Sequence, residues 1–213
     1  LLNGQIWQLI LARPAQKNAL SLAMYSDLAD ALTNFDANPA ARVLIVSAEG
    51  DSFCSGNDLA DFAALESLNT LTTKGPLGQF MMALRDCSKP VLAVVEGVAV
   101  GIGTTMLLHM DGVFASAKAS FRLPFVDLGL CPEYASSVLL PVRVGDLTAR
   151  KWLYSGSAVS AEEAKCAGFL SALSNEPLQA AMDYAEELCA KPQQALITTK
   201  RIVNEPWRQA VEE

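Results

Sequence analysis

Short apolar segments alternate with helical segments along this chain, and this alternation restricts the possible fold more than any other feature. The strand candidates are rich in Val, Ile, Leu and aromatic residues, as buried strands are, and lie at residues 5–12, 42–48, 91–97 and 111–117. Apolar side chains at helical spacing occupy much of the chain between them. This order of strands and helices favours an α/β fold over a sandwich or a helical bundle.

The first expected helix, at residues 21–39, has clear ends. Ser21 is a good N-cap, and Pro39 closes the helix because proline cannot continue it. Its apolar side chains recur at Leu22, Tyr25, Leu28, Leu32 and Phe35. Further helices are expected at residues 76–87, 101–110, 136–144, 146–155, 160–167, 178–190 and 192–204. We therefore expect an α/β core followed by a helical tail.

Composition excludes several classes of partner. The formal net charge of −7 argues against a nucleic-acid surface, which needs clustered Lys and Arg. No run of 18 apolar residues is present, so we expect no membrane span. Five cysteines without CxxC spacing favour buried, free thiols in a reducing compartment, with the cytoplasm as the default. A peroxisomal address stays open because the chain begins at Leu1 and targeting signals at either end could be missing.

Two glycine-containing loops each follow a strand and open into a helix. They are "FCSGND" at residues 53–58 and "VAVGIG" at residues 98–103. Free amide groups in such a turn can bind an anion or a developing oxyanion, and the alternative is an ordinary strand–helix turn. Neither loop matches GxGxxG or GxxxxGK[ST], so nucleotide binding of those kinds is not expected.

The residues for a serine hydrolase or a metal site are not in place. Ser55 lies in "CSGN" rather than GxSxG, and the single histidine, His109, falls late in an apolar helix where a core role is favoured. One histidine also excludes a His-rich metal site. We expect Asp111 and Asp127 to be helix-terminal or turn carboxylates rather than a catalytic pair.

Glu133 is the only charged residue in the apolar stretch "LGLCPEYASSVLLP" at residues 128–141. A carboxyl group in such surroundings loses hydration, and its pKa should rise toward the range of a general base near neutral pH. The alternative is a solvated glutamate in the first turn of a helix that starts at Pro132.

Five segments in order resemble the crotonase, or enoyl-CoA hydratase/isomerase, superfamily. They are "LARPAQKNALS" (11–21), "FCSGNDLADF" (53–62), "KPVLAVVEGVAVGIGTTMLLHMDGVFAS" (89–116), "ASFRLPFVDLGLCPEYASSVLLPVRVG" (119–145) and "SGSAVSAEEAKCAGFLS" (155–171). The resemblance spans essentially the whole chain. It implies a spiral of ββα units at residues 1–145 and a helical, trimer-forming region at residues 146–213.

The resemblance also implies roles for individual residues. The amides of Asn57 and Ile102 correspond to the two halves of the family's oxyanion hole, and the backbone around Ser55 to the place that receives the adenine of coenzyme A. The substrate-binding residues implied in the same way are Ser55, Gly56, Asp58, Gly101, Phe125, Leu128 and Leu130. For the last three, which would line the acyl chain, core packing is the alternative.

Departures from the family pattern point to one activity. Hydratases use two glutamates, and the corresponding positions here are Thr105 and Phe125, which cannot activate water. Glu133 instead follows Pro132, which is similar to the Δ3,Δ2-enoyl-CoA isomerases of the peroxisomal type. The resemblance therefore implies an isomerase that converts 3-enoyl-CoA to 2-trans-enoyl-CoA with Glu133 as its single general acid/base. The alternatives are an enoyl-CoA hydratase or other crotonase-type acyl-CoA enzyme, with Asp127 as the nearest second acid/base, and a non-catalytic acyl-CoA-binding protein.

The implied partners are an acyl-CoA thioester and further copies of the chain. Coenzyme A would be part of the substrate, so no separate cofactor and no metal are expected. The superfamily assembles through its C-terminal helices, which implies a homotrimer or a hexamer built as a dimer of trimers.

Overall fold

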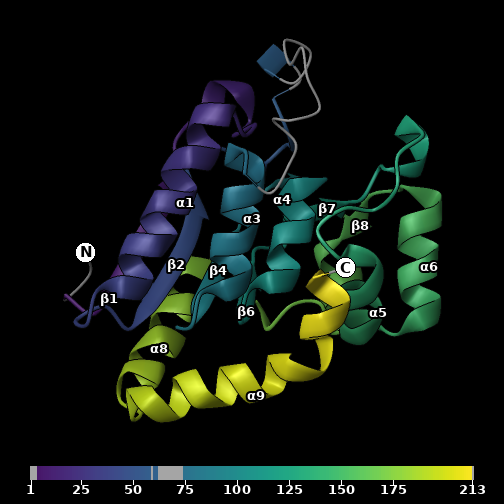
Figure 1. Cartoon of the computed structure of the whole chain (residues 1–213). Helices are drawn as coiled ribbons and strands as arrows, with labels where there is room; N and C mark the ends of the chain where they lie inside the picture. Colours follow the sequence, from purple (N-terminus) through teal and green to yellow (C-terminus); the bar gives the residue numbers. More distant parts are fainter. Residues whose placement is uncertain (1–3, 59, 62–73, 213) are drawn as a thin grey trace.

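The computed structural model describes residues 4–58, 60–61 and 74–212, and its larger sheet lies at the centre of the molecule (Figure 1). The strands of this sheet run in the order β1-β2-β4-β6-β9, and every neighbouring pair is parallel. They are β1 Ile6–Leu11, β2 Val43–Ala48, β4 Val91–Val95, β6 Gly112–Ala115 and β9 Ala172–Leu173. The four apolar segments identified in the sequence form the first four of these strands.

A second, smaller sheet has the order β3-β5-β7-β8. Its strands are β3 Ser52–Cys54, β5 Val98–Val100, β7 Ser120–Arg122 and β8 Val159–Ser160, of which only β8 is antiparallel to its neighbour. Each of β2, β4 and β6 continues directly into a strand of this second sheet before the chain returns through helices. This repetition of two strands and a helical stretch confirms the predicted α/β spiral of ββα units.

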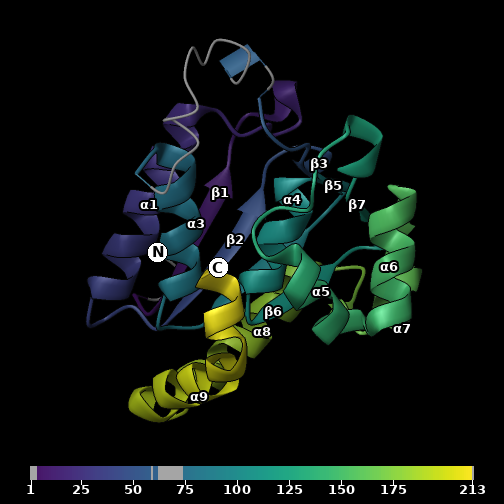
Figure 2. The same cartoon turned by 45° about the vertical axis from the view of Figure 1, so that its right-hand side comes forward.

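Helices cover both faces of the larger sheet, which explains why its strands are apolar on both sides. Helices α1 (Leu22–Ala37) and α3 (Pro76–Asp86) lie on one face, and α8 (Pro177–Cys189) lies on the other (Figures 1 and 2). In β2, Leu44 and Val46 join the main core, whereas Val43 and Ile45 pack with α8. The predicted cap of α1 is also confirmed, because the Ser21 side chain accepts a hydrogen bond from the Met24 amide.

The remaining helices follow the predicted order. They are α4 Ile102–Thr105, which continues as the 3-10 helix Met106–His109, then α5 Ser136–Val144, α6 Asp146–Ser155, α7 Ala161–Cys166 and α9 Gln193–Glu212. Helix α9 runs beneath the sheets, and its C-terminal end lies beside α5 (Figures 1 and 2). Its described residues are exposed or half-buried, but the Lys200 side chain is only 8% exposed and contacts the Lys89 carbonyl and Asp111. The division at residue 145 stays a prediction, although β8 and β9, which follow it, pair with strands that precede it.

The five cysteines are free, as predicted, but only Cys54 and Cys87 are buried. The expectation of buried thiols is wrong for Cys131 and Cys166, which are exposed. Within the described ranges, no helix is long and apolar enough to cross a membrane.

Candidate functional site

The first glycine loop leaves β3 and is held by pairing with the N-terminal segment. Leu20 donates its amide to the Gly56 carbonyl at 2.8 Å and accepts the Asp58 amide at 2.9 Å. This parallel bridge is centred on Asn57, so the amide of Asn57 itself lies outside the bridging bonds. Gly56 has φ +106°, a conformation that glycine adopts without strain.

Arg13 and Asn18 support this loop, and neither was singled out from the sequence. The Arg13 guanidinium contacts Asp58 at 3.0 Å, and this hydrogen bond lowers the pKa of the Asp58 carboxyl group. The fully buried Asn18 side chain donates to the carbonyls of Glu49 and Ser52. Asp58, expected to bind substrate, is therefore engaged within the protein, and a direct role in binding stays a prediction. Residues 59 and 62 of the same motif lie outside the described residues.

The second glycine loop turns from β5 into α4. Gly101 has φ +55° and is the N-cap of this helix, where its carbonyl accepts the amides of Thr104 and Thr105. Ile102 is the first helical residue, so its amide has no acceptor within the helix. The Ile102 side chain is buried, which fixes the direction of the main chain at this point.

Close packing at glycines places the two loops side by side. Strands β3 and β5 are neighbours in the second sheet, with Cys54 opposite Ala99. A Cβ atom on Gly103 would lie 2.5 Å from the Cys54 carbonyl oxygen, and one on Gly56 would lie 3.3 Å from that of Val100. The Asn57 and Ile102 amides thus emerge at the same end of two paired strands.

Glu133 is half-buried, and burial raises the pKa of its carboxyl group to about 7. Its backbone carbonyl accepts the amide and hydroxyl of Ser136 at 3.0 and 2.6 Å. In the described part of the chain, no hydrogen bond or ion pair engages its carboxylate. Both carboxylate oxygens therefore remain available to a ligand.

Tyr25 is bonded to the first loop and lies within the electrostatic influence of Glu133. Its hydroxyl donates a hydrogen bond to the Asn57 side-chain oxygen. Burial raises the pKa of Tyr25, and electrostatic interactions with Cys54 and Glu133 act in the same direction. This buried tyrosine was predicted only as part of the apolar face of α1, because its hydroxyl partner is distant in sequence.

The helix expected at residues 136–144 is confirmed, and the alternative of a helix that starts at Pro132 is not. Helix α5 begins at Ser136, and the two residues between Glu133 and the helix, Tyr134 and Ala135, have φ values of 53° and 51°. Glu133 therefore lies in a tight left-handed turn rather than in the first turn of a helix. The left-handed turn could not be predicted from the sequence, because Tyr and Ala rarely adopt positive φ.

The other predicted lining residues differ in exposure. Phe125 is 6% exposed and belongs to the main core, whereas Leu128 and Leu130 are 65% and 58% exposed. Thr105 is fully buried, and its hydroxyl has no hydrogen-bond partner among the described residues. Ser55 donates its hydroxyl to the Gln16 carbonyl at 3.3 Å.

The three side chains expected to be structural are engaged within the fold. His109 contacts the Tyr134 carbonyl at 2.9 Å, and burial lowers the pKa of its imidazole to about 4, so it is neutral. Asp111 accepts the Val91 amide and forms an ion pair with Lys200 at 2.7 Å. Asp127 forms an ion pair with Arg122 at 3.0 Å.

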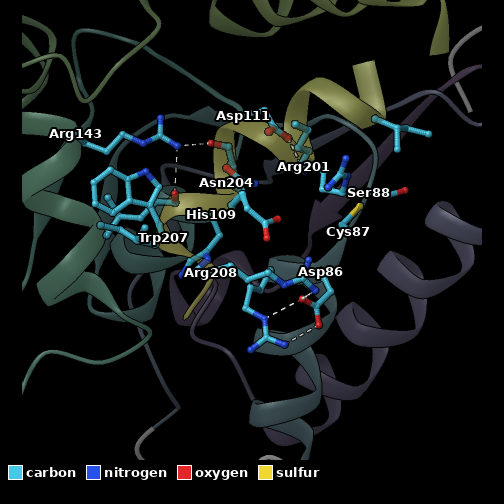
Figure 3. A pocket seen from close by; sticks show the side chains of 17 residues that line it. Asp86, Cys87, Ser88, His109, Asp111, Arg143, Arg201, Asn204, Trp207 and Arg208 are labelled. Carbon is cyan, nitrogen blue, oxygen red and sulfur yellow. Dashed lines mark hydrogen bonds and ion pairs between the residues drawn. The ribbon is translucent and has the colours of Figure 1, made fainter. Parts of the chain in front are cut away.

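A cavity of about 220 Å³ lies elsewhere, between the end of α3, the 3-10 helix before β6, α5 and α9 (Figure 3). Several of its charged groups already have partners: Arg143 donates to the Leu108 and Met110 carbonyls, and Lys200 pairs with Asp111. None of the predicted site residues lines it. His109, labelled in Figure 3, forms part of its wall, so this cavity lies behind the turn that carries Glu133.

The fold and the site together define an α/β spiral protein in which two strand-end loops lie side by side, and a half-buried glutamate acts electrostatically on the tyrosine bonded to one of them. The family model described as "Enoyl-CoA hydratase/isomerase" matches residues 2–213. The chain belongs to this family, the crotonases, whose members act on acyl-CoA.

Relatives and solved structures agree with this membership. The chain is 36% identical over 171 residues to "Enoyl-CoA delta isomerase 2" of Rattus norvegicus, which covers 79% of this chain and 44% of the relative. It is 31% identical over 189 residues to "Enoyl-CoA hydratase ACTT3" of Alternaria alternata, covering 87% of this chain and 64% of the relative. The chain thus spans about half to two thirds of the length of these relatives.

Among solved structures, that of Pseudomonas aeruginosa OdaA superposes with a TM-score of 0.91 at 38% identity, covering 98% of this chain and 84% of that chain. The structure of an enoyl-CoA hydratase/isomerase from Pseudoalteromonas atlantica T6c superposes with a TM-score of 0.92 at 33% identity, covering 99% of this chain and 83% of that chain. Both likenesses extend over almost the whole chain, and the relatives include isomerases and hydratases alike.

Proposed function

We propose that this protein is an isomerase that shifts the double bond of a 3-enoyl-CoA to give 2-trans-enoyl-CoA. The observation that carries the proposal is the state of Glu133, a half-buried carboxyl group with a pKa of about 7 and both oxygens unengaged in the described structure. Thr105 and Phe125 stand where the family resemblance places the two hydratase glutamates. The similarity to a rat protein named an enoyl-CoA delta isomerase supports the same activity.

In the proposed reaction, Glu133 removes a proton from C2 of the substrate. The electron pair of the broken C–H bond moves into a dienolate, whose negative charge rests largely on the thioester oxygen. Glu133 then returns the proton to C4, so the double bond ends between C2 and C3. Atoms and charge balance without water or a second base. A pKa near 7 suits this role, because the carboxyl group must both accept and release the proton at neutral pH.

The amides of Asn57 and Ile102 would donate hydrogen bonds to the thioester oxygen. Each such donor typically contributes about 3–4 kcal/mol to the stabilisation of an oxyanion. The glycine contacts between their loops support this role, since donors held rigidly need not reorganise as charge develops. Tyr25, bonded to the Asn57 side chain, would hold the first donor in place.

The substrate is an acyl-CoA, and its binding surface would extend from the loops to the segment before Glu133. Ser55, Gly56 and Gly101 would contact the coenzyme A part through the main chain, with Asp58 fixing the loop by its ion pair with Arg13. Phe125, Leu128 and Leu130 would line the acyl chain. We also propose that the protein assembles as a homotrimer or a dimer of trimers.

Replacement of the proposed base tests the function directly. Glu133→Gln removes the only proton carrier in the proposed mechanism, so turnover of a 3-enoyl-CoA should fall by about 10³-fold or more. Formation of the conjugated thioester, followed by absorbance, measures it. Glu162→Gln, on the exposed side of α7, is the matched control and should retain wild-type turnover. Near-normal conversion by Glu133→Gln would refute the assignment.

A hydratase is the second candidate, because relatives such as the Alternaria protein carry that name. It requires a second acid/base, and the nearest candidate in sequence, Asp127, is already paired with Arg122 at 3.0 Å. Incubation of the enzyme with a 2-enoyl-CoA in water separates the two activities. Loss of the conjugated double bond at a rate comparable to isomerisation would favour the hydratase.

A further inference from the structure

The turn that carries Glu133 has an unfavourable backbone. Tyr134 and Ala135 are consecutive non-glycine residues with φ values of 53° and 51°. At positive φ the Cβ atom of a non-glycine residue comes too close to the main-chain carbonyl oxygen. Such residues therefore keep this left-handed conformation only when their surroundings impose it. The contacts that impose it therefore determine where Glu133 lies.

His109 and Met81 hold Tyr134 at three points. The His109 Nε2 atom lies 2.9 Å from the Tyr134 carbonyl oxygen, and the two rings stack with their centroids 3.7 Å apart and their planes 19° apart. The Tyr134 hydroxyl donates to the Met81 carbonyl of α3 at 2.6 Å. The turn is thus tied to α3 and to the helical stretch that begins at Ile102, one of the proposed oxyanion donors.

The bond from His109 also fixes the state of the imidazole. A carbonyl oxygen can only accept, so Nε2 carries the proton. Burial lowers the pKa of His109 to about 4, which keeps the ring neutral and leaves Nδ1 unprotonated at neutral pH. His109 therefore acts here as a fixed hydrogen-bond donor and not as a proton shuttle.

The Glu133 carboxylate has no comparable anchor of its own in the described structure. A proton shuttle needs its oxygens free, so its direction must be set through the main chain on either side. Ser136 holds the Glu133 carbonyl, and the constrained Tyr134 follows immediately. A shift of about 1 Å in a reacting group can lower the rate of a reaction by about 10²-fold.

We propose that His109 and Tyr134 are positioning residues that hold the carboxyl group of Glu133 in its reactive place by enforcing the left-handed turn beside it. The proposal rests on the proposed isomerase function and deepens it. It assigns a role to the protein's one histidine that involves no contact with substrate.

The test separates hydrogen bonding from packing. His109→Phe keeps a stacking ring but removes the donor, so kcat should fall by about 10- to 100-fold while KM changes less than about twofold. His109→Gln places an amide donor near the position of Nε2 and should recover most of kcat. Tyr134→Phe removes only the bond to Met81 and should give a smaller loss of kcat. Tyr184→Phe, which alters a tyrosine of α8 that is 38% exposed, is the matched control.

A second measurement does not depend on turnover. The Glu133 carboxyl carbon, labelled with ¹³C and assigned by its loss in Glu133→Gln, reports the pKa of this group by NMR. We expect a pKa near 7 in the wild type, a shift toward 4.5 in His109→Phe, and a return in His109→Gln. An unchanged pKa together with an unchanged kcat in His109→Phe would overturn the positioning role.

The outcomes distinguish this inference from the proposed function. If Glu133→Gln retains wild-type isomerisation, the proposed function fails, and the NMR titration still decides whether His109 positions Glu133. If Glu133→Gln is inactive but His109→Phe matches the wild type in both measurements, only the positioning role fails. Should His109→Phe not fold, Tyr134→Phe carries the same two measurements, with a wild-type kcat and pKa as the contradicting result.

Discussion

Burial alone raises the pKa of Glu133, and this has a consequence for stability as well as for chemistry. Below about pH 4.5 the group is protonated in both the folded and the unfolded chain. Between about 4.5 and 7 the folded protein retains a proton that the unfolded chain has lost. The free energy of unfolding therefore falls as the pH rises through this interval, because the folded state must bear a poorly hydrated charge.

This pH dependence should disappear when the carboxyl group is removed. At pH 8, Glu133→Gln should be more stable than the wild type by an amount on the order of 2 kcal/mol, reduced for its partial exposure, and at pH 4 the two should be equal. Urea unfolding at several pH values measures the difference. The exposed Glu162→Gln should leave the pH dependence of the wild type unchanged. A difference that is the same at pH 4 and pH 8 would contradict this interpretation of the burial.

At the scale of elements, Gly103 allows the main chain of α4 to pack directly against the main chain of β3. Gly103 and the Cys54 carbonyl leave no room for a methyl group, and this is where the two loops of the candidate site are held together. The geometry of both amide donors should therefore depend on the contact between these two elements.

Gly103→Ala tests that dependence. Because the added Cβ would lie 2.5 Å from a carbonyl oxygen of the main chain, the loops must separate, at a cost of about 1–3 kcal/mol in stability. We expect kcat to fall by about 10-fold or more as one oxyanion donor moves. Gly4→Ala, where φ is +80° but no atom lies within 4 Å of the new Cβ, is the control for glycine replacement and should keep wild-type kcat. A fully active Gly103→Ala would show that the loops tolerate separation.

The longer elements could be predicted from sequence, because each carries its own periodic pattern. The helix at residues 21–39 and the strand at 42–48 were found within two residues of their ends. Strands β3, β5 and β7 have three residues each, which is too short for an alternation to be recognised, and two of them lie inside segments expected to be loops. Glu133 was recognisable because it is the only charge in an apolar stretch, whereas the contacts of His109 and Tyr25 depend on residues distant in the chain.

At the scale of the whole molecule, one side carries apolar side chains that the protomer leaves exposed. Leu147 and Tyr154 lie on α6 with 83% and 66% of their surface exposed. On helix α9, Ile202 and Val203 are 58% and 62% exposed. Exposed apolar surface of this kind is typical of a protein that associates with further copies of itself or with other partners.

The mass in solution tests the predicted assembly. Light scattering after size exclusion should give three or six times the protomer mass of 22.7 kDa. Leu147→Glu places a charge on the apolar side and should shift the mass toward that of the protomer, because burying an unpaired charge is costly. Leu178→Glu on α8, where the leucine is 40% exposed, is the control and should leave the mass unchanged. A wild-type mass of one protomer at micromolar concentration would contradict the prediction.

The proposed donors at Asn57 and Ile102 are main-chain amides, so the ability to hold a thioester anion does not depend on the side chains that carry out the reaction. Any residue except proline supplies such an amide, so mutation can alter the neighbouring side chains while the means of holding a thioester anion persists. During evolution, the side chains at Thr105, Phe125 and Glu133 could then be replaced, and the reaction changed, while the protein keeps its ability to stabilise the thioester anion. For the protein engineer, the same property marks these three positions as the ones to vary together when a new acyl-CoA reaction is sought.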